Sequence, residues 1–155
     1  MPCRIAAAIL CLVVLAGCGA AQITDKPGDR ATIRFEAGYA AARTQLNGTL
    51  TAVAGTLNLI HTSPTAAARV PRRLAVLAVR FGRELGPLEA LTPPAKARAA
   101  FRTLTTSLNR VEGDLHEIPV AATRRNYPGA VLAVENFYSD ARAAADAAVA
   151  IRPKP

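Results

Sequence analysis

The sequence predicts an all-α protein, an up-down-up-down four-helix bundle over residues 29–152 that follows a cleaved signal peptide and a flexible tether. Three observations predict this fold. Apolar residues recur at spacings of three and four in four separate stretches, which is the pattern of helices that bury one face. Short segments that contain proline separate the stretches. No segment alternates β-branched and polar residues as a half-buried strand would.

The first predicted helix spans about residues 30–61 and the second about residues 64–91. In the first, the apolar stripe runs from Phe35 to Ile60, and three glycines lower its helix propensity or let a neighbouring helix approach closely. Thr62-Ser63-Pro64 predicts the break, because a hydroxyl can cap a helix and proline suits its first turn. We expect Pro71 either to begin the main part of the second helix or to kink it.

The third predicted helix spans about residues 93–118 and the fourth about residues 127–151. Thr92 can cap the third helix, and Pro119 is expected to end or bend it. Its stripe is Ala97, Phe101, Leu104, Leu108, Val111, Leu115 and Ile118. The inner face predicted for the fourth helix is Val131, Val134, Phe137 or Tyr138, Ala141, Ala145 and Ala148. Because its second half is nearly all alanine, a neighbouring helix must lie close there or the end will fray.

Residues 1–17 predict an export signal. A short basic start, Met1 to Arg4, precedes an apolar run from Ile5 to Leu15, and small residues follow, which is the organisation of a cleaved signal peptide. The apolar run is too short for a permanent span, since a membrane-crossing helix needs about 20 apolar residues.

The four residues Leu15, Ala16, Gly17 and Cys18 resemble the lipobox of bacterial lipoproteins, with leucine three positions before the cysteine and two small residues between them. The resemblance implies cleavage before Cys18, diacylation of its thiol, and anchoring at the extracytoplasmic face of the cell membrane or of an outer membrane. An ordinary signal peptide with an incidental cysteine is the alternative interpretation.

The segment between the anchor and the helices, residues 18–28, has no sustained periodicity and ends in a Pro-Gly turn signal. It predicts a lipidated tether. Cys3 and Cys11 would leave with the signal, so the processed chain has no cysteine pair for a disulfide and depends on packing for stability. The run Leu88 to Pro94, followed by a regular helix, is similar to a pattern in small uncharacterised helical-bundle lipoproteins of bacteria, and this resemblance implies no activity.

The charge balance favours anionic neighbours. The chain has 19 Lys and Arg against 11 Asp and Glu, a formal net charge of +8, which suits lipid headgroups or an anionic envelope polymer. Nucleic acid is not expected as a partner, because no aromatic and basic platform is present. A surface with surplus arginine is the alternative. The predicted topology brings the candidate membrane-surface residues to the anchored end: Arg30, Arg34, Lys96, Arg98, Arg102, Arg152 and Lys154.

One cluster has the residue types of a metal site: His61, Glu112, His116 and Glu117. Glu112 and His116 are four residues apart and share a helix face, and the predicted topology places His61 at the same pole. Imidazole and carboxylate groups bind divalent metals. However, Gly113 stands where di-iron bundles have glutamate, so a solvated acidic face is the alternative.

Other chemistry is not indicated. The sequence contains no nucleophile elbow, zinc-protease motif or phosphate-binding glycine loop, and C-x-x-C-H for haem is missing. We therefore expect no enzyme activity and no cofactor. The sequence favours a lipid-anchored cell-envelope protein whose non-enzymatic bundle has structural or protein-interaction roles. The alternative is a lipoprotein that holds a metal ion or small apolar molecule at one pole of the bundle, although the sequence alone predicts no spare volume between the helices.

Overall fold

The structure, a computed structural model, describes residues 27–61 and 64–151 of the 155-residue chain. Every regular element in these residues is a helix, which confirms the predicted all-α class with four long helices. The elements in chain order are α1 (Pro27–Asn58), the 3-10 helix η2 (Leu59–His61), α2 (Pro64–Ala67), α3 (Val70–Glu89), the 3-10 helix η3 (Ala95–Ala97), α4 (Arg98–Thr123) and α5 (Tyr127–Ala150).

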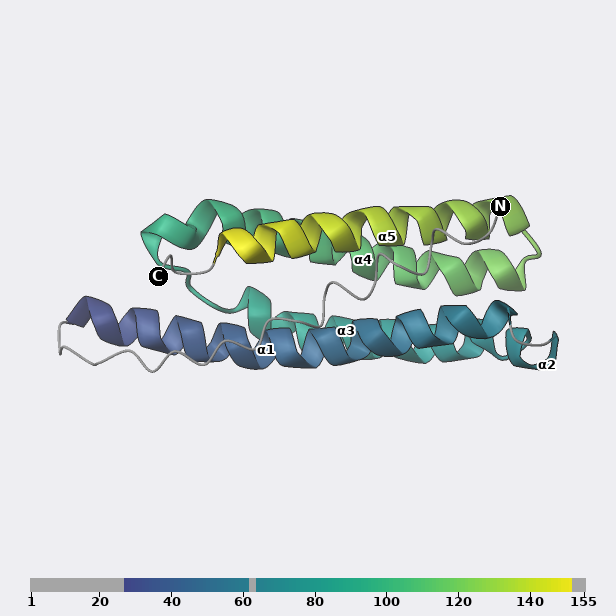
Figure 1. The fold of residues 1–155 in the computed structure, drawn as a ribbon, viewed down its shortest axis with the longest axis horizontal. Coiled ribbons are helices and arrows are strands. Elements are labelled where there is room, and N and C mark those ends of the chain that lie inside the picture. The colour runs from purple at the N-terminus through teal and green to yellow at the C-terminus, as the bar shows by residue number, and fades with distance from the viewer. Residues whose placement is uncertain (1–26, 62–63, 152–155) are drawn as a thin grey trace.

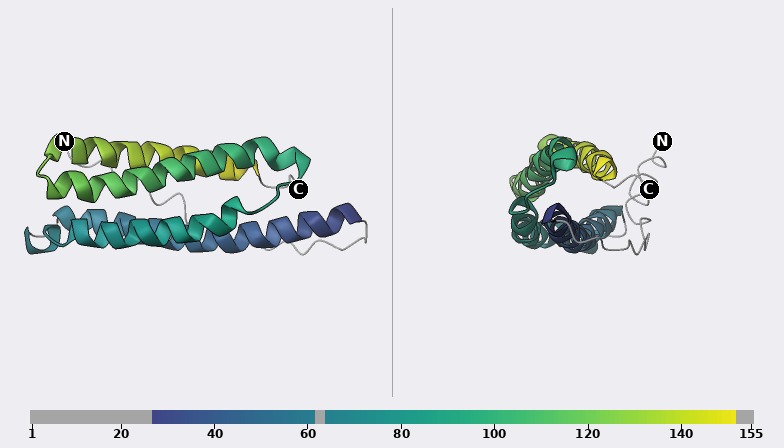
Figure 2. Two further views of the ribbon diagram at one scale, coloured as in Figure 1. Left: turned by 180° about the vertical axis from the view of Figure 1, so that it is seen from behind. Right: turned by 90° about the vertical axis from the view of Figure 1, so that its left-hand side faces the viewer.

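The four long helices pack as two pairs. Helix α1 lies along α3, α5 lies along α4, and the contact between α3 and α4 joins the two pairs (Figure 1). Seen along the helices, the four form an open arc with α1 and α5 at its two ends (Figure 2). The start of α1, the start of α4 and the end of α5 lie toward one end of the molecule (Figure 1).

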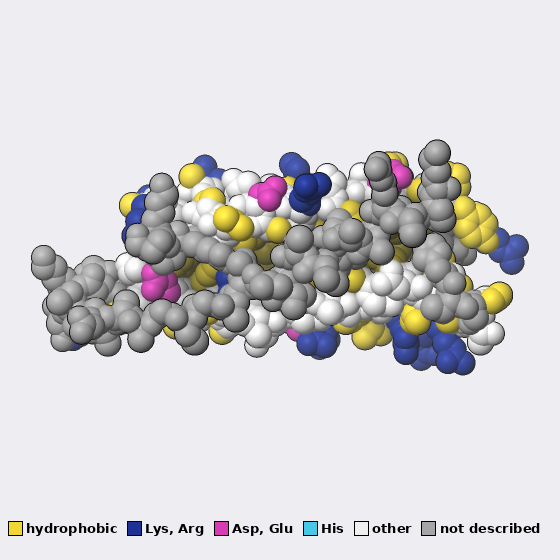
Figure 3. Space-filling model, in the orientation of Figure 1, with side chains coloured by type: hydrophobic (Ala, Val, Ile, Leu, Met, Phe, Trp, Pro, Cys, Tyr) yellow, Lys and Arg dark blue, Asp and Glu magenta, His cyan; other side chains and the backbone are white. Residues whose placement is uncertain are grey.

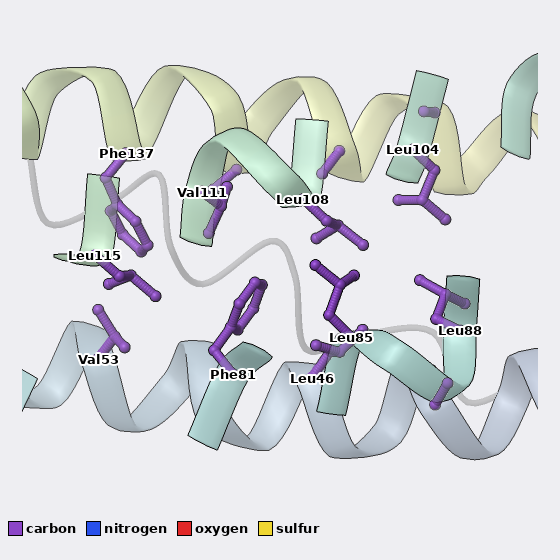
Figure 4. Packing of buried hydrophobic residues seen from close by; sticks show 14 of the residues in the cluster. Leu46, Val53, Phe81, Leu85, Leu88, Leu104, Leu108, Val111, Leu115 and Phe137 are labelled. Atoms are coloured by element: carbon purple, nitrogen blue, oxygen red, sulfur yellow. The ribbon is translucent and has the colours of Figure 1, made fainter. Parts of the chain in front are cut away.

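The core is centred on the contact between α3 and α4. Phe81 of α3 points toward Val111 of α4 and Leu85 points toward Leu108, and all four side chains are at most 5% exposed (Figure 4). Burying an aromatic or leucine side chain completely contributes about 1.5–3 kcal/mol. The stripe predicted for the third helix is confirmed, because each of its seven members is buried: Ala97, Phe101, Leu104, Leu108, Val111, Leu115 and Ile118.

The predicted second helix, residues 64–91, is two helices, so the prediction of one helix is wrong. Helix α2 ends in a tight turn in which Arg69 N–H donates to Ala66 O at 3.1 Å. Pro71 then lies in the first turn of α3, one of its two expected roles. Proline has no N–H for the carbonyl four residues earlier and clashes with it, whereas in a first turn neither defect matters.

The predicted third helix, residues 93–118, is displaced toward the C-terminus. Pro94 has an extended backbone, with φ −61° and ψ 155°, and lies before η3, which no side chain caps. Helix α4 begins only at Arg98, and its N-cap residue is Ala97, so Thr92 does not cap it. At the other end α4 continues past Pro119, which is buried. Of the two effects predicted for Pro119, ending the helix is wrong, and bending it stays a prediction.

The turn between α4 and α5 is built from local hydrogen bonds. Arg125 adopts a left-handed conformation, with φ 57°, and Asn126 N–H donates to Ala121 O at 2.9 Å. The Asn126 side chain then accepts a hydrogen bond from Gly129 N–H at 3.1 Å, which is the expected N-cap interaction. The predicted start of the last helix near residue 127 is confirmed.

The inner face predicted for the last helix is only partly right. Val131 is 58% exposed and Val134 is half-buried, while the buried residues are Ala133, Phe137, Ala141, Ala144, Ala147 and Ile151. Small residues allow α5 to pack closely on α4. Val131 therefore turns away, Val134 packs only at the margin of the core, and alanines occupy most of the contact.

Candidate functional site

A cavity of about 490 Å³ lies on the open side of the arc, between α1 and α5. Figure 3 views this side of the molecule and shows hydrophobic side chains in the seam between the two helices. Small-molecule sites in proteins usually have volumes of about 300–1,000 Å³. The cavity, called the α1–α5 groove below, is therefore large enough for a ligand.

The floor of the α1–α5 groove is made of four leucines from three helices. Leu46 comes from α1, Leu88 from α3, and Leu104 and Leu108 from α4, and each is between 1% and 5% exposed. Figure 4 shows these four leucines among the other labelled side chains of the core. Because core side chains are closely packed, the floor is a fixed apolar surface.

The α5 wall of the groove is made mainly of alanines: Ala141, Ala144, Ala145 and Ala148. Their methyl groups are too short to fill the space toward α1, which is why a volume remains there. The alanine-rich second half of this helix was visible in the sequence. This alanine-rich half predicts a close neighbouring helix. Helix α4 is that neighbour on one face of α5, whereas the face of α5 toward α1 borders the unfilled groove.

The α1 wall carries every polar side chain that lines the groove: Tyr39, Arg43, Thr44, Asn47 and Thr51. The two threonine hydroxyls donate to their own helix, Thr44 to Ala40 O at 3.0 Å and Thr51 to Asn47 O at 2.8 Å. Arg43 and Asn47 are one turn apart and therefore share a face. Arg43 is the only Asp, Glu, Lys or Arg among the lining residues that the structure describes.

A partly buried hydrogen-bond network links α1 to α3 beside the groove. The Thr49 hydroxyl, which is 0% exposed, donates to Glu84 Oε2 on α3 at 2.6 Å. Arg80 Nε donates to the other oxygen of the same carboxylate at 2.7 Å. Thr49 lies between Gly48 and Leu50, which both line the groove. Sequence reasoning missed this network, because nothing in the chain marks Thr49 and Glu84 as partners.

The residues predicted for a metal site face different surroundings. Glu112 lies against α3, where a Cβ on Gly82 would collide with its carboxylate, while His116 and Glu117 are exposed. No group of three or more His, Cys, Asp or Glu able to hold a metal ion occurs among the described residues. The side chain of His61 lies outside the described part of the chain, so the metal site stays a prediction.

Asp114, next to these residues, has a perturbed carboxyl group. Its Oδ2 atom is buried and has no hydrogen-bond partner. The pKa of Asp114 is raised from 3.8 to about 6, mainly by burial and in addition by the nearby carboxylates of Asp140 and Glu117. Asp140 Oδ1 lies 3.8 Å from Arg110 Nη1 across the contact of α4 with α5. The raised pKa makes the stability of the domain depend on pH.

Five of the seven predicted membrane-surface residues lie in the described part of the chain. Arg30 and Arg34 are exposed in the first turns of α1, Lys96 is exposed in η3, and Arg98 and Arg102 are exposed at the start of α4. These segments share one end of the molecule (Figure 1). Arg152 and Lys154 lie outside the described residues.

The predicted signal peptide, residues 1–17, and the predicted lipidation site, Cys18, also lie outside the described part of the chain. Among the helices that the structure does describe, none combines the length and the apolar character needed to cross a membrane.

The described residues thus define an all-helical domain with an apolar groove that is open on one side. Comparison of the chain with protein-family models, with curated proteins and with solved structures found no match.

Proposed function

We propose that the chain is a lipid-anchored, non-enzymatic protein of the cell envelope whose helical domain binds an apolar ligand in the α1–α5 groove. The groove is the observation that carries this proposal. A bundle that served only as a rigid spacer would be more stable with this side filled by larger side chains. Instead, alanines face a leucine floor across about 490 Å³ of free volume. This favours ligand binding over a purely structural role.

The anchor is proposed from the sequence Leu15-Ala16-Gly17-Cys18. One acyl chain alone holds a protein on a membrane only weakly, whereas the two chains of the proposed diacylation anchor it stably. A basic patch would strengthen this attachment. The basic residues near the starts of α1 and α4 supply such a patch at one end, which would face anionic headgroups. Each basic side chain close to such a surface contributes about 1 kcal/mol.

The proposal includes an up-down-up-down order of the four long helices. It is supported by the positions of their ends in Figure 1, where the links between successive helices alternate between the two ends of the molecule. In this arrangement the tether before α1 and the basic starts of α1 and α4 belong to the membrane-proximal end.

Metabolic labelling with a palmitate analogue tests the anchor. We expect label on the wild-type chain and none on Cys18→Ser, with the labelled protein in the membrane fraction. Label that persists in Cys18→Ser, or a wild-type protein recovered without label, would reject the lipid anchor.

Binding of the neutral dye Nile red tests the groove. We expect residues 18–155 to bind one dye molecule, since all helices that line the groove lie within residues 27–151. Ala145→Phe should abolish binding by filling the groove, whereas Ala143→Phe, on an exposed position of the same helix, should leave it unchanged. Equal binding by both variants would reject the groove as the ligand site.

A second candidate function, protein interaction, is favoured by the end of the molecule that carries the turn between α4 and α5. Four large apolar side chains near this turn are between 48% and 68% exposed: Val120, Tyr127, Val131 and Leu132. Exposed apolar residues that cluster are typical of interfaces. Crosslinking in intact cells tests this function, and a crosslinked product that survives Leu132→Asp unchanged would argue against it.

A further inference from the structure

We propose that the α1–α5 groove binds a long-chain fatty acid, with the carboxylate at Arg43 and Asn47 and the hydrocarbon tail along the leucine floor. This rests on the proposed role of the groove as a ligand site and goes further by naming the chemical class of the ligand. The size and shape of the groove, the distribution of its polar groups, and its charge each support the assignment.

The size and shape of the groove fit one hydrocarbon chain. A volume of about 490 Å³ lies within the usual range for small-molecule sites and leaves room for one long hydrocarbon chain. The lining on α1 runs from Tyr39 to Thr51, which is about 18 Å at 1.5 Å per residue. A groove of this length accommodates an extended chain better than a compact ring system.

The surface that would face the tail is apolar on two sides. The four floor leucines are buried and belong to the core, and the α5 wall offers alanine methyl groups and Val149. Neither side contains a polar side chain, so a hydrocarbon chain displaces only water when it binds. A ligand with polar groups along its whole length would leave them without hydrogen bonds here.

The polar side of the groove fits an anionic head group. Arg43 and Asn47, both half-buried, lie one turn apart on α1 at the edge of the groove. A guanidinium group binds a carboxylate through charge-assisted hydrogen bonds, and the Asn47 amide, which forms no hydrogen bond with any other described side chain, can add a donor. None of the lining residues is Asp or Glu, so an anionic head group meets no like charge within the groove.

Displacement of Nile red from residues 18–155 carrying Cys18→Ser tests the proposal. The competitors are palmitate and hexadecanol, which share a sixteen-carbon chain and differ in the head group. We expect palmitate to bind at least tenfold more tightly than hexadecanol. Arg43→Gln should remove this difference by weakening palmitate alone, and Arg83→Gln, an exposed arginine on α3 outside the groove, should retain it. Circular dichroism checks that each variant is folded.

The outcomes separate this inference from the function on which it rests. Equal displacement by palmitate and hexadecanol, or a preference that survives Arg43→Gln, would overturn the head-group assignment while the groove remained a ligand site. Bound Nile red that neither competitor displaces would overturn the acyl ligand. Failure to bind Nile red at all would reject the proposed function itself.

Two other occupants of the groove give distinct results. A dimer in analytical ultracentrifugation that palmitate does not dissociate would show that a second copy covers the groove, and it would overturn the proposal. Palmitate binding to residues 18–155 that is absent from the acylated protein would show that the lipid on Cys18 occupies the same groove, which also overturns a free fatty acid as the occupant.

Discussion

Two sides of the domain are built from side chains of different size. One is the contact between α3 and α4, and the other is the α1–α5 groove. At the first, Phe81, Leu85, Val111 and Leu115 fill the space and are almost fully buried. At the second, alanines face α1 and leave a cavity. The comparison teaches that a closely packed core on one side of the domain can coexist with an unfilled groove on another.

The largest expected effect is on the filled side. Phe81→Ala should lower the free energy of unfolding by about 3–5 kcal/mol, since it removes a fully buried aromatic ring and leaves a cavity. Leu50→Ala, at a half-buried position that lines the groove, should cost no more than about 2 kcal/mol, the low end for leucine. Urea denaturation of residues 18–155 measures both, and similar losses would break the comparison between the two sides.

The next effect concerns the network that links α1 to α3. Glu84→Ala leaves the buried Thr49 hydroxyl without its acceptor, and an unsatisfied buried polar group costs about 1–3 kcal/mol. Because the loss of this hydrogen bond removes one constraint on the position of α1 beside the groove, we expect weaker Nile red binding as well as lower stability. Glu36→Ala, at an exposed position of α1, is the control. A loss of stability with unchanged dye affinity would show that the network does not shape the groove.

The free energy of unfolding should depend on pH through Asp114, which lies near the contact of α4 with α5. The pKa of Asp114 is about 6 in the folded protein against an ordinary value of 3.8, so the folded state holds the proton more tightly. Stability should therefore fall as pH rises from about 4 to 6, and this loss persists at higher pH. A pKa raised by about two units corresponds to about 3 kcal/mol of unfolding free energy for a fully buried group. The partial exposure of Asp114 reduces the expected loss to about 1 kcal/mol.

Asp114→Asn removes the ionisation and tests this effect. The variant should gain about 1 kcal/mol over the wild type at pH 8 and nothing at pH 4, measured as unfolding free energies in urea at each pH. A difference between the two proteins that is the same at both pH values would contradict the assignment of the pH dependence to Asp114.

The smallest expected effect compares two glycines of α1. A Cβ on Gly48, beside the groove, would meet nothing within 4 Å, whereas a Cβ on Gly38 would meet Leu91 Cδ2 at 2.7 Å. Gly48→Ala should therefore stabilise the protein by up to about 1 kcal/mol through helix propensity, and Gly38→Ala should gain less. Thermal melts of both variants check this, and the reverse order would mean that the space beside Gly48 is filled.

The helical class and the core of α4 could be predicted from sequence, because regular spacing fixes which residues share a face. Boundaries at proline were harder. Pro71, Pro94 and Pro119 carry the same local signal, yet one begins a helix, one precedes it and one lies inside it. Local sequence does not decide between these positions, and Pro119 is buried inside α4.

The groove could not be predicted because it depends on which helices are neighbours. The alanine run after residue 140 was noted, but alanine on a helix face is compatible with close packing or with an unfilled space. Only the placement of α5 against α4, away from α1, distinguishes the two. Likewise, Thr49 and Glu84 are 35 residues apart, and no local pattern links them.

The most direct test of the central claim, an unfilled groove between α1 and α5, is a methyl NOE spectrum of ligand-free residues 18–155. We expect cross-peaks that join Leu46 to the core leucines on α3 and α4, and none that join Thr44 or Thr51 of α1 to Ala148 of α5. Strong cross-peaks between those threonine and alanine methyl groups would show that the two helices close on each other, and they would contradict the account.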